Sequence, residues 1–170
     1  MTTEVGGLKI NTELMDCVIQ ATVEGLQMTG IVPEAVGASQ FSTGSKELSV
    51  LVGLHGNRNG NMTMNLSERT AVFLAGKLFA DEGMSELTED AIDGVCELGN
   101  MVAGRMKELL GKTDYAFKAI SLPAIVFGAN YNLYHLKNIE TVSVTFEISE
   151  VSIVNVKDKF FTTSISLMGT

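Results

Sequence analysis

Four residues near the middle of the chain combine acids, a carboxamide and a glycine at helical spacing. Asp93, Glu97, Asn100 and Gly104, which we call the polar stripe, follow one another at i, i+4, i+7 and i+11. All four therefore fall on one narrow face of an α-helix. The amide of asparagine offers a hydrogen-bond donor and an acceptor together. A helix that only packs within its own domain has no need for a carboxylate and a carboxamide beside a glycine. The pattern predicts a helix that enters the active site of another protein.

The helix that carries the polar stripe is predicted over residues 88–110. Thr88 can cap its N-terminus, Glu89 and Asp90 favour its positive end, and Gly111 ends it. Its apolar residues take a different face: Ile92, Val95, Cys96, Val102, Met106, Leu109 and Leu110. The solvated side of an ordinary amphipathic helix has a similar composition, so on these residues alone that interpretation stays open.

Three glycines interrupt this helix, and each costs about 0.8–1 kcal/mol relative to alanine in a helix interior. Gly99 lies on the apolar side, where it lets a neighbouring helix or strand come close. Gly104 lies on the polar stripe, where a missing side chain leaves room for a foreign backbone beside the carboxamide. Internal packing is an equally good explanation for Gly94 and Gly99.

The composition narrows the function classes. The chain has 170 residues, 45% of them hydrophobic and 19% charged, which is enough for a hydrophobic core. Its net charge of −8 disfavours nucleic acid and anionic membrane surfaces as partners. Cys17 and Cys96 lie in apolar helical patterns, without the spacing of a zinc site, and are expected to be buried reduced thiols. No secretion signal or long apolar run is visible, so we expect a cytoplasmic protein that binds no metal.

The rest of the pattern predicts two more helices and several strands. The helices are 11–29 and 67–80, the strands are 35–42, 48–55, 61–66, 117–127, 140–149 and 160–168, and 128–138 is a loop. The glycine-bounded segment 56–60 predicts a hairpin turn, and 155–159 a second turn or its approach. This order favours an α+β fold, a mostly antiparallel sheet with long helices packed on one face. We expect a single domain over 1–170, built from two similar halves of about 1–83 and 84–170.

The helix motif resembles a known family signature. The stretch from Asp93 to Gly104, Asp-Gly-Val-Cys-Glu-Leu-Gly-Asn-Met-Val-Ala-Gly, is similar to that of the CheC/CheX/FliY chemotaxis phosphatases. Ile120-Ser-Leu-Pro123 followed by Gly128 resembles the same family, as do the hairpin and the helix after Ser67. The resemblance covers most of the chain, is closest to CheX, and implies the CheC-like pseudo-repeat fold.

The resemblance also implies an activity: hydrolysis of the phosphoaspartate on the receiver domain of a CheY-like response regulator. Asn100 would then orient the attacking water and Glu97 would pair with the lysine of the receiver's active site. Asp93, Met101 and Gly104 would contact the partner. The receiver supplies its own Mg²⁺, so no cofactor is expected on this chain.

The first predicted helix carries a degenerate copy of the motif. Asp16, Gln20 and Val23 stand at the matching offsets, but Gln20 lacks the charge and Val23 cannot position water. We therefore expect one active site per chain. The alternative is a non-catalytic module that docks a receiver domain, or a scaffold of the flagellar-switch type. CheX-like proteins form dimers through their sheets, so we expect a homodimer, with the strand edge after Glu140 as its seam.

Overall fold

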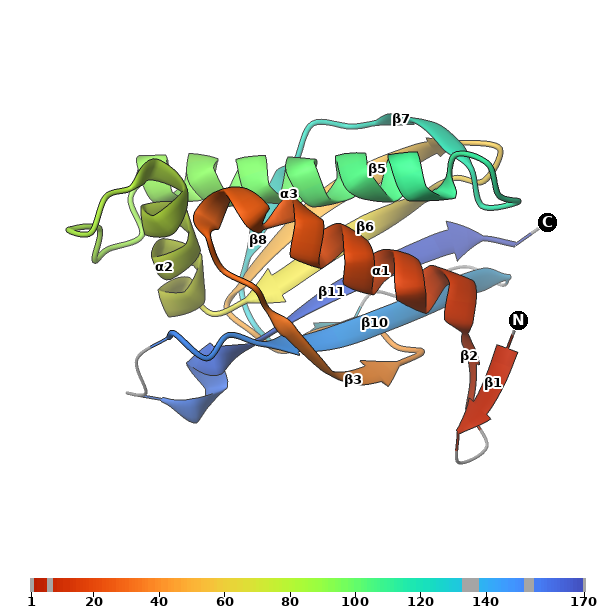
Figure 1. Cartoon of the computed structure of the whole chain (residues 1–170), viewed down its shortest axis with the longest axis horizontal. Helices are drawn as coiled ribbons and strands as arrows, with labels where there is room; N and C mark the ends of the chain where they lie inside the picture. Colours follow the sequence, from red (N-terminus) through yellow and green to blue (C-terminus); the bar gives the residue numbers. More distant parts are fainter. Residues whose placement is uncertain (1, 6–7, 133–137, 152–154, 170) are drawn as a thin grey trace.

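The computed structural model describes residues 2–5, 8–132, 138–151 and 155–169. Its centre is a seven-stranded sheet with α1 and α3 lying side by side across one face and α2 at one end (Figure 1). The N-terminus and the C-terminus lie at the same end of the molecule (Figure 1). The predicted α+β fold, with an antiparallel sheet and helices on one face, is confirmed. No helix among the described residues is both long and apolar enough to cross a membrane.

The described residues form helices and strands in the following order along the chain. They are β1 (Thr2–Val5), β2 (Leu8–Asn11), α1 (Thr12–Gly25), the 3₁₀ helix η1 (Gln27–Thr29), β3 (Glu34–Ser39), β4 (Thr43–Gly44), β5 (Leu48–Gly56), β6 (Gly60–Leu66), α2 (Glu68–Phe79), α3 (Glu89–Leu110), β7 (Phe117–Ile120), β8 (Ala124–Phe127), β9 (Tyr131–Asn132), β10 (Ile139–Glu147), the 3₁₀ helix η2 (Val156–Lys159) and β11 (Phe160–Met168).

Both α2 and α3 begin at the predicted caps. The hydroxyl of Thr88 accepts a hydrogen bond from the backbone N–H of Ala91 at the start of α3, and Gly111 follows its last residue. The hydroxyl of Ser67 accepts from the backbone N–H of Thr70 at the start of α2, at 3.2 Å. These local bonds satisfy N–H groups that have no partner inside the helix.

The sheet is built from two hairpins that meet in its middle. β5 pairs with β6 and β10 pairs with β11, and β6 and β11 join the hairpins, so the strand order is β3-β10-β11-β6-β5-β7. All pairs in this sheet are antiparallel. Strand residues that point toward the helices, such as Val50, Met62, Val144 and Ile165, are buried. Residues on the other face of the central strands, such as Asn65 and Ser143, are polar and also buried, so the two faces differ in polarity rather than in burial.

Four sequence predictions need correction. The strand over 117–127 is two strands that both pair with β5, separated by a break that contains Pro123, which cannot donate a backbone hydrogen bond. The helix over 11–29 ends at Gly25, and its last turn is the 3₁₀ helix η1. The strand over 35–42 ends at Ser39. The loop over 128–138 contains β9, which pairs with β4.

The expected dimer seam is also wrong for most of its length. β10 is an inner strand, because β11 pairs with one side and β3 with the other from Ser143 to Glu147. The outer strands of the sheet are β3 on one side and β7 with β8 on the other.

Close packing around glycines fixes α3 against its neighbours. A Cβ atom on Gly99 would lie 2.7 Å from Cγ1 of Val50 in β5, and one on Gly94 would lie 2.8 Å from a ring carbon of Phe79 in α2. On α1, a Cβ on Gly25 would lie 2.6 Å from Cγ2 and 2.9 Å from Cα of Val102 in α3. The absence of a side chain at each position lets two elements come together, which offsets the low helix propensity of glycine.

We predict that Gly25→Ala destabilises the protein by about 1–3 kcal/mol, because the new methyl group meets the backbone of α3 and forces a shift. Denaturant unfolding measures this change. Gly104→Ala is the matched control: nothing lies within 4 Å of its Cβ position, so it should stabilise the fold by about 1 kcal/mol. Equal stabilities for the two variants would contradict the close contact between α1 and α3.

Candidate functional site

The structure places the whole polar stripe on the outer face of α3. Asp93 and Glu97 are exposed, whereas Asn100 and Gly104 are half-buried. The opposite face of the helix is buried against the sheet and the other two helices, through Val95, Leu98, Val102 and Met106 among others. Met101 is half-buried and packs at the margin of the core, beside the stripe. The five residues predicted from the sequence therefore share one accessible surface.

The functional groups of this surface have no polar partner in the described part of the chain. Among the described residues, no hydrogen bond or ion pair involves the side chain of Asp93, Glu97 or Asn100. The space above Gly104 is open, since nothing lies within 4 Å of a Cβ built there. A carboxylate and a carboxamide one turn apart, beside an open notch in the helix, are free to bind groups of another molecule.

The two cysteines differ in their surroundings. Cys17 on α1 is buried, and burial together with the charge of Glu13 raises the pKa of its thiol to about 12. Cys96 on α3 is only partly buried and lies next to Glu97 in the sequence; burial, and then the charge of Asp93, raises the pKa of its thiol. The predicted burial is thus confirmed for Cys17 and holds only in part for Cys96.

The degenerate motif lies on the outer side of α1. Asp16 and Gln20 are exposed and Val23 is half-buried. The amide of Gln20 donates a 2.9 Å hydrogen bond to Oε1 of Glu24, and Glu24 in turn binds Arg105 of α3. The position that matches Glu97 is therefore occupied in a contact within the chain.

The family of the chain is decided by a comparison of its sequence with family models. The model described as "Chemotaxis phosphatase CheX" matches residues 48–147, a stretch from β5 to the end of β10 that contains all of α3. The chain belongs to the CheX family. No curated protein sequence shows significant similarity to this CheX-family chain.

Solved structures share this fold over nearly their whole length. CheX from Desulfovibrio desulfuricans superposes with a TM-score of 0.75 at 20% identity, covering 91% of this chain and 99% of its own. A CheC-like superfamily protein from Shewanella sp. PV-4 has a TM-score of 0.76 at 21% identity, with 94% and 100% covered. CheX from Borrelia burgdorferi, solved in a complex with CheY, BeF₃ and Mg²⁺, has a TM-score of 0.70 at 24% identity, with 91% and 97% covered.

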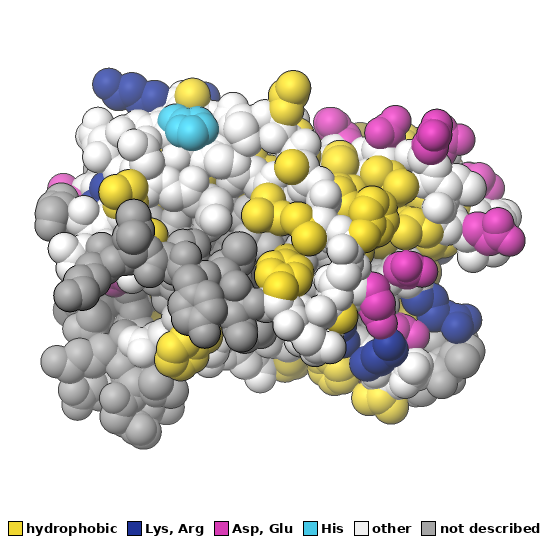
Figure 2. All heavy atoms as spheres, turned by 180° about the vertical axis from the view of Figure 1, so that it is seen from behind, with side chains coloured by type: hydrophobic (Ala, Val, Ile, Leu, Met, Phe, Trp, Pro, Cys, Tyr) yellow, Lys and Arg dark blue, Asp and Glu magenta, His cyan; other side chains and the backbone are white. Residues whose placement is uncertain are grey.

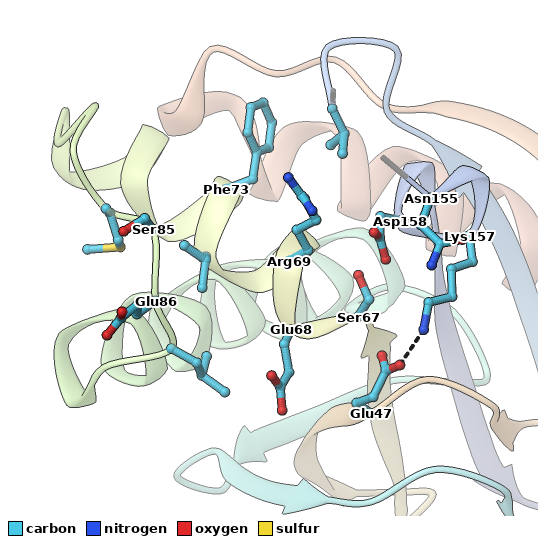
Figure 3. Close-up of a pocket in the computed structure, with 14 residues that line it drawn as sticks. Glu47, Ser67, Glu68, Arg69, Phe73, Ser85, Glu86, Asn155, Lys157 and Asp158 are labelled. Carbon is cyan, nitrogen blue, oxygen red and sulfur yellow. Dashed lines mark hydrogen bonds and ion pairs between the residues drawn. The ribbon is translucent and has the colours of Figure 1, made fainter. Parts of the chain in front are cut away.

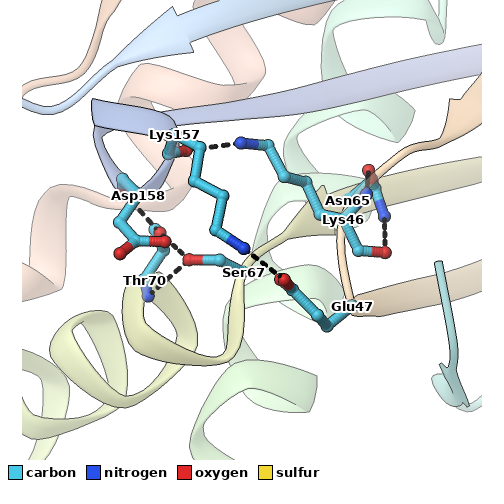
Figure 4. A network of polar contacts seen from close by, with 7 residues as sticks. All are labelled: Lys46, Glu47, Asn65, Ser67, Thr70, Lys157 and Asp158. Carbon is cyan, nitrogen blue, oxygen red and sulfur yellow. Dashed lines mark hydrogen bonds and ion pairs between the residues drawn. The ribbon is translucent and has the colours of Figure 1, made fainter. Parts of the chain in front are cut away.

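A groove of about 920 Å³ elsewhere in this CheX-family domain contains none of the predicted site residues. It lies between the start of α2, the connection from α2 to α3, and η2 (Figure 3). Its polar groups bind one another: Nζ of Lys157 lies 2.6 Å from Oε1 of Glu47, and the hydroxyl of Thr70 donates to the backbone oxygen of Asp158 at 2.6 Å (Figure 4). The Thr70 bond fastens η2 to α2 and the Lys157 ion pair fastens η2 to the residue before β5, so we assign the groove a structural role.

The face behind the sheet has a different character. Figure 2 shows hydrophobic side chains gathered on part of this face, with acidic side chains at the end where α2 meets α3. Leu122, which precedes the outer strand β8, is 89% exposed, and Phe127, the last residue of β8, is 57% exposed. Among the described residues, no cluster of three or more histidine, cysteine or acidic side chains could hold a metal ion.

Sequence reasoning missed the ion pair beside the stripe. Nε of Arg105 donates to Oε2 of Glu24 at 2.7 Å, and a second guanidinium nitrogen binds the same oxygen. Arg105 also pairs with Glu108, one turn further along α3. The i, i+3 spacing of Arg105 and Glu108 was a usable signal, but the link to α1 depends on how two distant helices pack.

We predict that a maleimide reagent at pH 8 labels Cys96 and leaves Cys17 unlabelled in the folded protein, because the raised pKa and burial of Cys17 keep it a protonated, inaccessible thiol. Mass spectrometry of Cys17→Ser and Cys96→Ser, before and after unfolding, assigns the labelled site. Fast labelling of Cys17 in the folded protein would contradict the packing of α1.

Proposed function

We propose that this chain is a phosphatase that hydrolyses the phosphoaspartate of a CheY-like response regulator. The observation that supports this most directly is the free Glu97 and Asn100 pair on the outer face of α3. Membership of the CheX family and the fold shared with a CheX that was solved with CheY point to the same partner. The protein would act in the cytoplasm, in chemotaxis or another two-component signalling pathway.

Docking on the receiver domain would begin with the carboxylate of Glu97. Glu97 lies one turn from Asn100, so a lysine that binds its carboxylate brings the carboxamide to the phosphoryl group beside that lysine. Asp93, one turn further out, and Met101 would contact the rim of the partner. The open notch at Gly104 gives the partner's backbone room to approach α3.

Catalysis would need little more than a positioned water molecule. An acyl phosphate is already reactive, and the receiver holds its own Mg²⁺, so neither a nucleophile nor a metal is required on this chain. The amide of Asn100 accepts a hydrogen bond from a water and donates one to a phosphoryl oxygen, which aligns the water with the phosphorus atom. A rate gain of about a hundredfold corresponds to about 2.7 kcal/mol, which positioning alone can supply.

We predict that Asn100→Ala lowers the turnover of phosphorylated receiver about a hundredfold with little change in receiver affinity, because it removes the group that holds the water. Glu97→Ala should weaken receiver binding as well, because it removes the docking charge. Phosphate release at several receiver concentrations separates the two effects.

Lys112→Met is the control for this pair, since it changes an exposed side chain just beyond the end of α3 and away from the polar stripe. If wild type and Asn100→Ala release phosphate equally while both bind the receiver, the phosphatase proposal fails. The chain would then be a receiver-docking or flagellar-switch-type scaffold.

We also propose that the chain forms a homodimer through an outer edge of its sheet. The outer strands β3, β7 and β8 each have one side without a partner strand in the described part of the sheet, and β8 carries exposed apolar side chains. Sedimentation at micromolar concentration should give the mass of a dimer. A monomer at all concentrations up to about 100 µM, far above the Kd of a stable dimer, would contradict this proposal.

A further inference from the structure

Asn100 lies between two glycines of α3, which lower the intrinsic helix propensity of this segment. Gly99 precedes it directly and Gly104 follows one turn later, and glycine has the lowest helix propensity after proline. Gly99 is held on its inner side, where its Cβ position lies 2.7 Å from Val50. Gly104 has no neighbour within 4 Å of its Cβ position, so the outer side of the helix has no packing support there.

The residue after this weak segment is tied to α1. Arg105 donates from Nε to Oε2 of Glu24 at 2.7 Å, and a second guanidinium nitrogen binds the same oxygen. The other oxygen of Glu24 accepts the 2.9 Å hydrogen bond from Gln20. Both oxygens of the carboxylate are thus used, which fixes its orientation between two side chains.

The pKa shifts of Glu24 and Arg105 agree with this geometry. The hydrogen bond from Gln20, followed by that from Arg105, lowers the pKa of the Glu24 carboxyl. The hydrogen bond to Glu24 is the main cause that raises the pKa of Arg105. The charged forms of both groups are therefore favoured by the contact.

The ion pair between Glu24 and Arg105 joins α1 and α3 where the two helices lie close together. Gly25 follows Glu24 and packs on Val102, so the backbones of α1 and α3 are close at the base of the ion pair. Val102 lies between Asn100 and Arg105 in the sequence. A contact at Gly25 on the inside and one at Glu24 on the outside hold this segment of α3 from two directions.

We propose that Gln20, Glu24 and Arg105 form a brace that holds the Asn100 segment of α3 in place when a partner docks, and that Arg105 is a positioning residue for the water-orienting carboxamide. This inference rests on the function proposed above. It gives the degenerate motif of α1 a use: Gln20, at the position that matches Glu97, orients the carboxylate that braces the intact motif. Because a misplacement of about 1 Å can cost up to a hundredfold in rate, a small bend in α3 would lower turnover without removing a contact with the partner.

The test uses Arg105→Met and Glu24→Gln in the full chain. Each should lower kcat for phosphate release about three- to fivefold and leave receiver affinity unchanged, a size typical of losing an exposed ion pair. Hydrogen exchange at the backbone amides of Ala103 and Gly104 should quicken by a similar factor, because these amides bond across the weak segment. Lys112→Met removes the same charge just beyond the end of α3, outside the brace and the polar stripe, and should change neither readout. The double variant Glu24→Arg with Arg105→Glu restores the opposite charges and should recover at least half of the lost turnover.

Three results would overturn the brace. The first is that the wild type is active and Arg105→Met has the same turnover and the same amide exchange rates. The second is a loss of receiver affinity with kcat intact, which would make Arg105 a docking residue. The third is no recovery in the double variant, which would mean that Arg105 does not act through Glu24. The wild-type arm reports separately on the proposed function, because a chain that releases no phosphate fails there whatever its amide exchange shows.

Discussion

The close approach of α3 to its neighbours is the constraint on which the site depends. Gly99 lets α3 settle on Val50 of the sheet, Gly94 lets it meet α2, and Gly25 of α1 packs on Val102. At each contact a neighbour fills the space that a side chain would take, so α3 cannot rotate about its axis without a collision. The rotation of α3 decides which residues face outward, and the glycine contacts therefore orient the polar stripe.

This arrangement explains why a helix with three glycines is kept in a fold that has to be stable. Two of the glycines, Gly94 and Gly99, are needed for packing, and their cost in helix propensity is offset by the contacts that they allow. Gly104 has no such contact among the described residues, so no packing within the chain offsets its low helix propensity. Under the proposed function, the open position at Gly104, beside Asn100 and Glu97, is where the partner would approach α3.

Local features of the fold could be predicted from the sequence, and long-range ones could not. Thr88, Ser67 and the turn at 56–60 act through neighbouring residues, and the caps and the hairpin that they predict are present. The pairing of β3 with β10 joins residues more than a hundred positions apart, so no local pattern reveals it, and the inferred free edge of β10 was wrong for that reason. The short strands β1, β2, β4 and β9 were missed because segments of two to four residues are too short to show alternation.

In the candidate site, too, local features could be predicted from the sequence and long-range ones could not. A period of 3.6 residues was enough to place Asp93, Glu97, Asn100 and Gly104 on one face, because the face of a helix depends only on its own sequence. Their exposure could not be derived in this way, since it depends on where α1 and α2 pack. The bond between Arg105 and Glu24 joins two helices that are far apart in the sequence, and it required the structure.

The central claim is that the outer face of α3 enters the phosphorylated pocket of a receiver domain. The most direct measurement is an NMR titration of this chain with a beryllofluoride-activated receiver, following the side-chain amide of Asn100 and the backbone amides of α3. The account predicts the largest shifts at Asn100, Glu97 and Gly104, and much smaller ones with the inactive receiver. Shifts confined to the groove between α2 and η2, with the Asn100 amide unchanged, would contradict it.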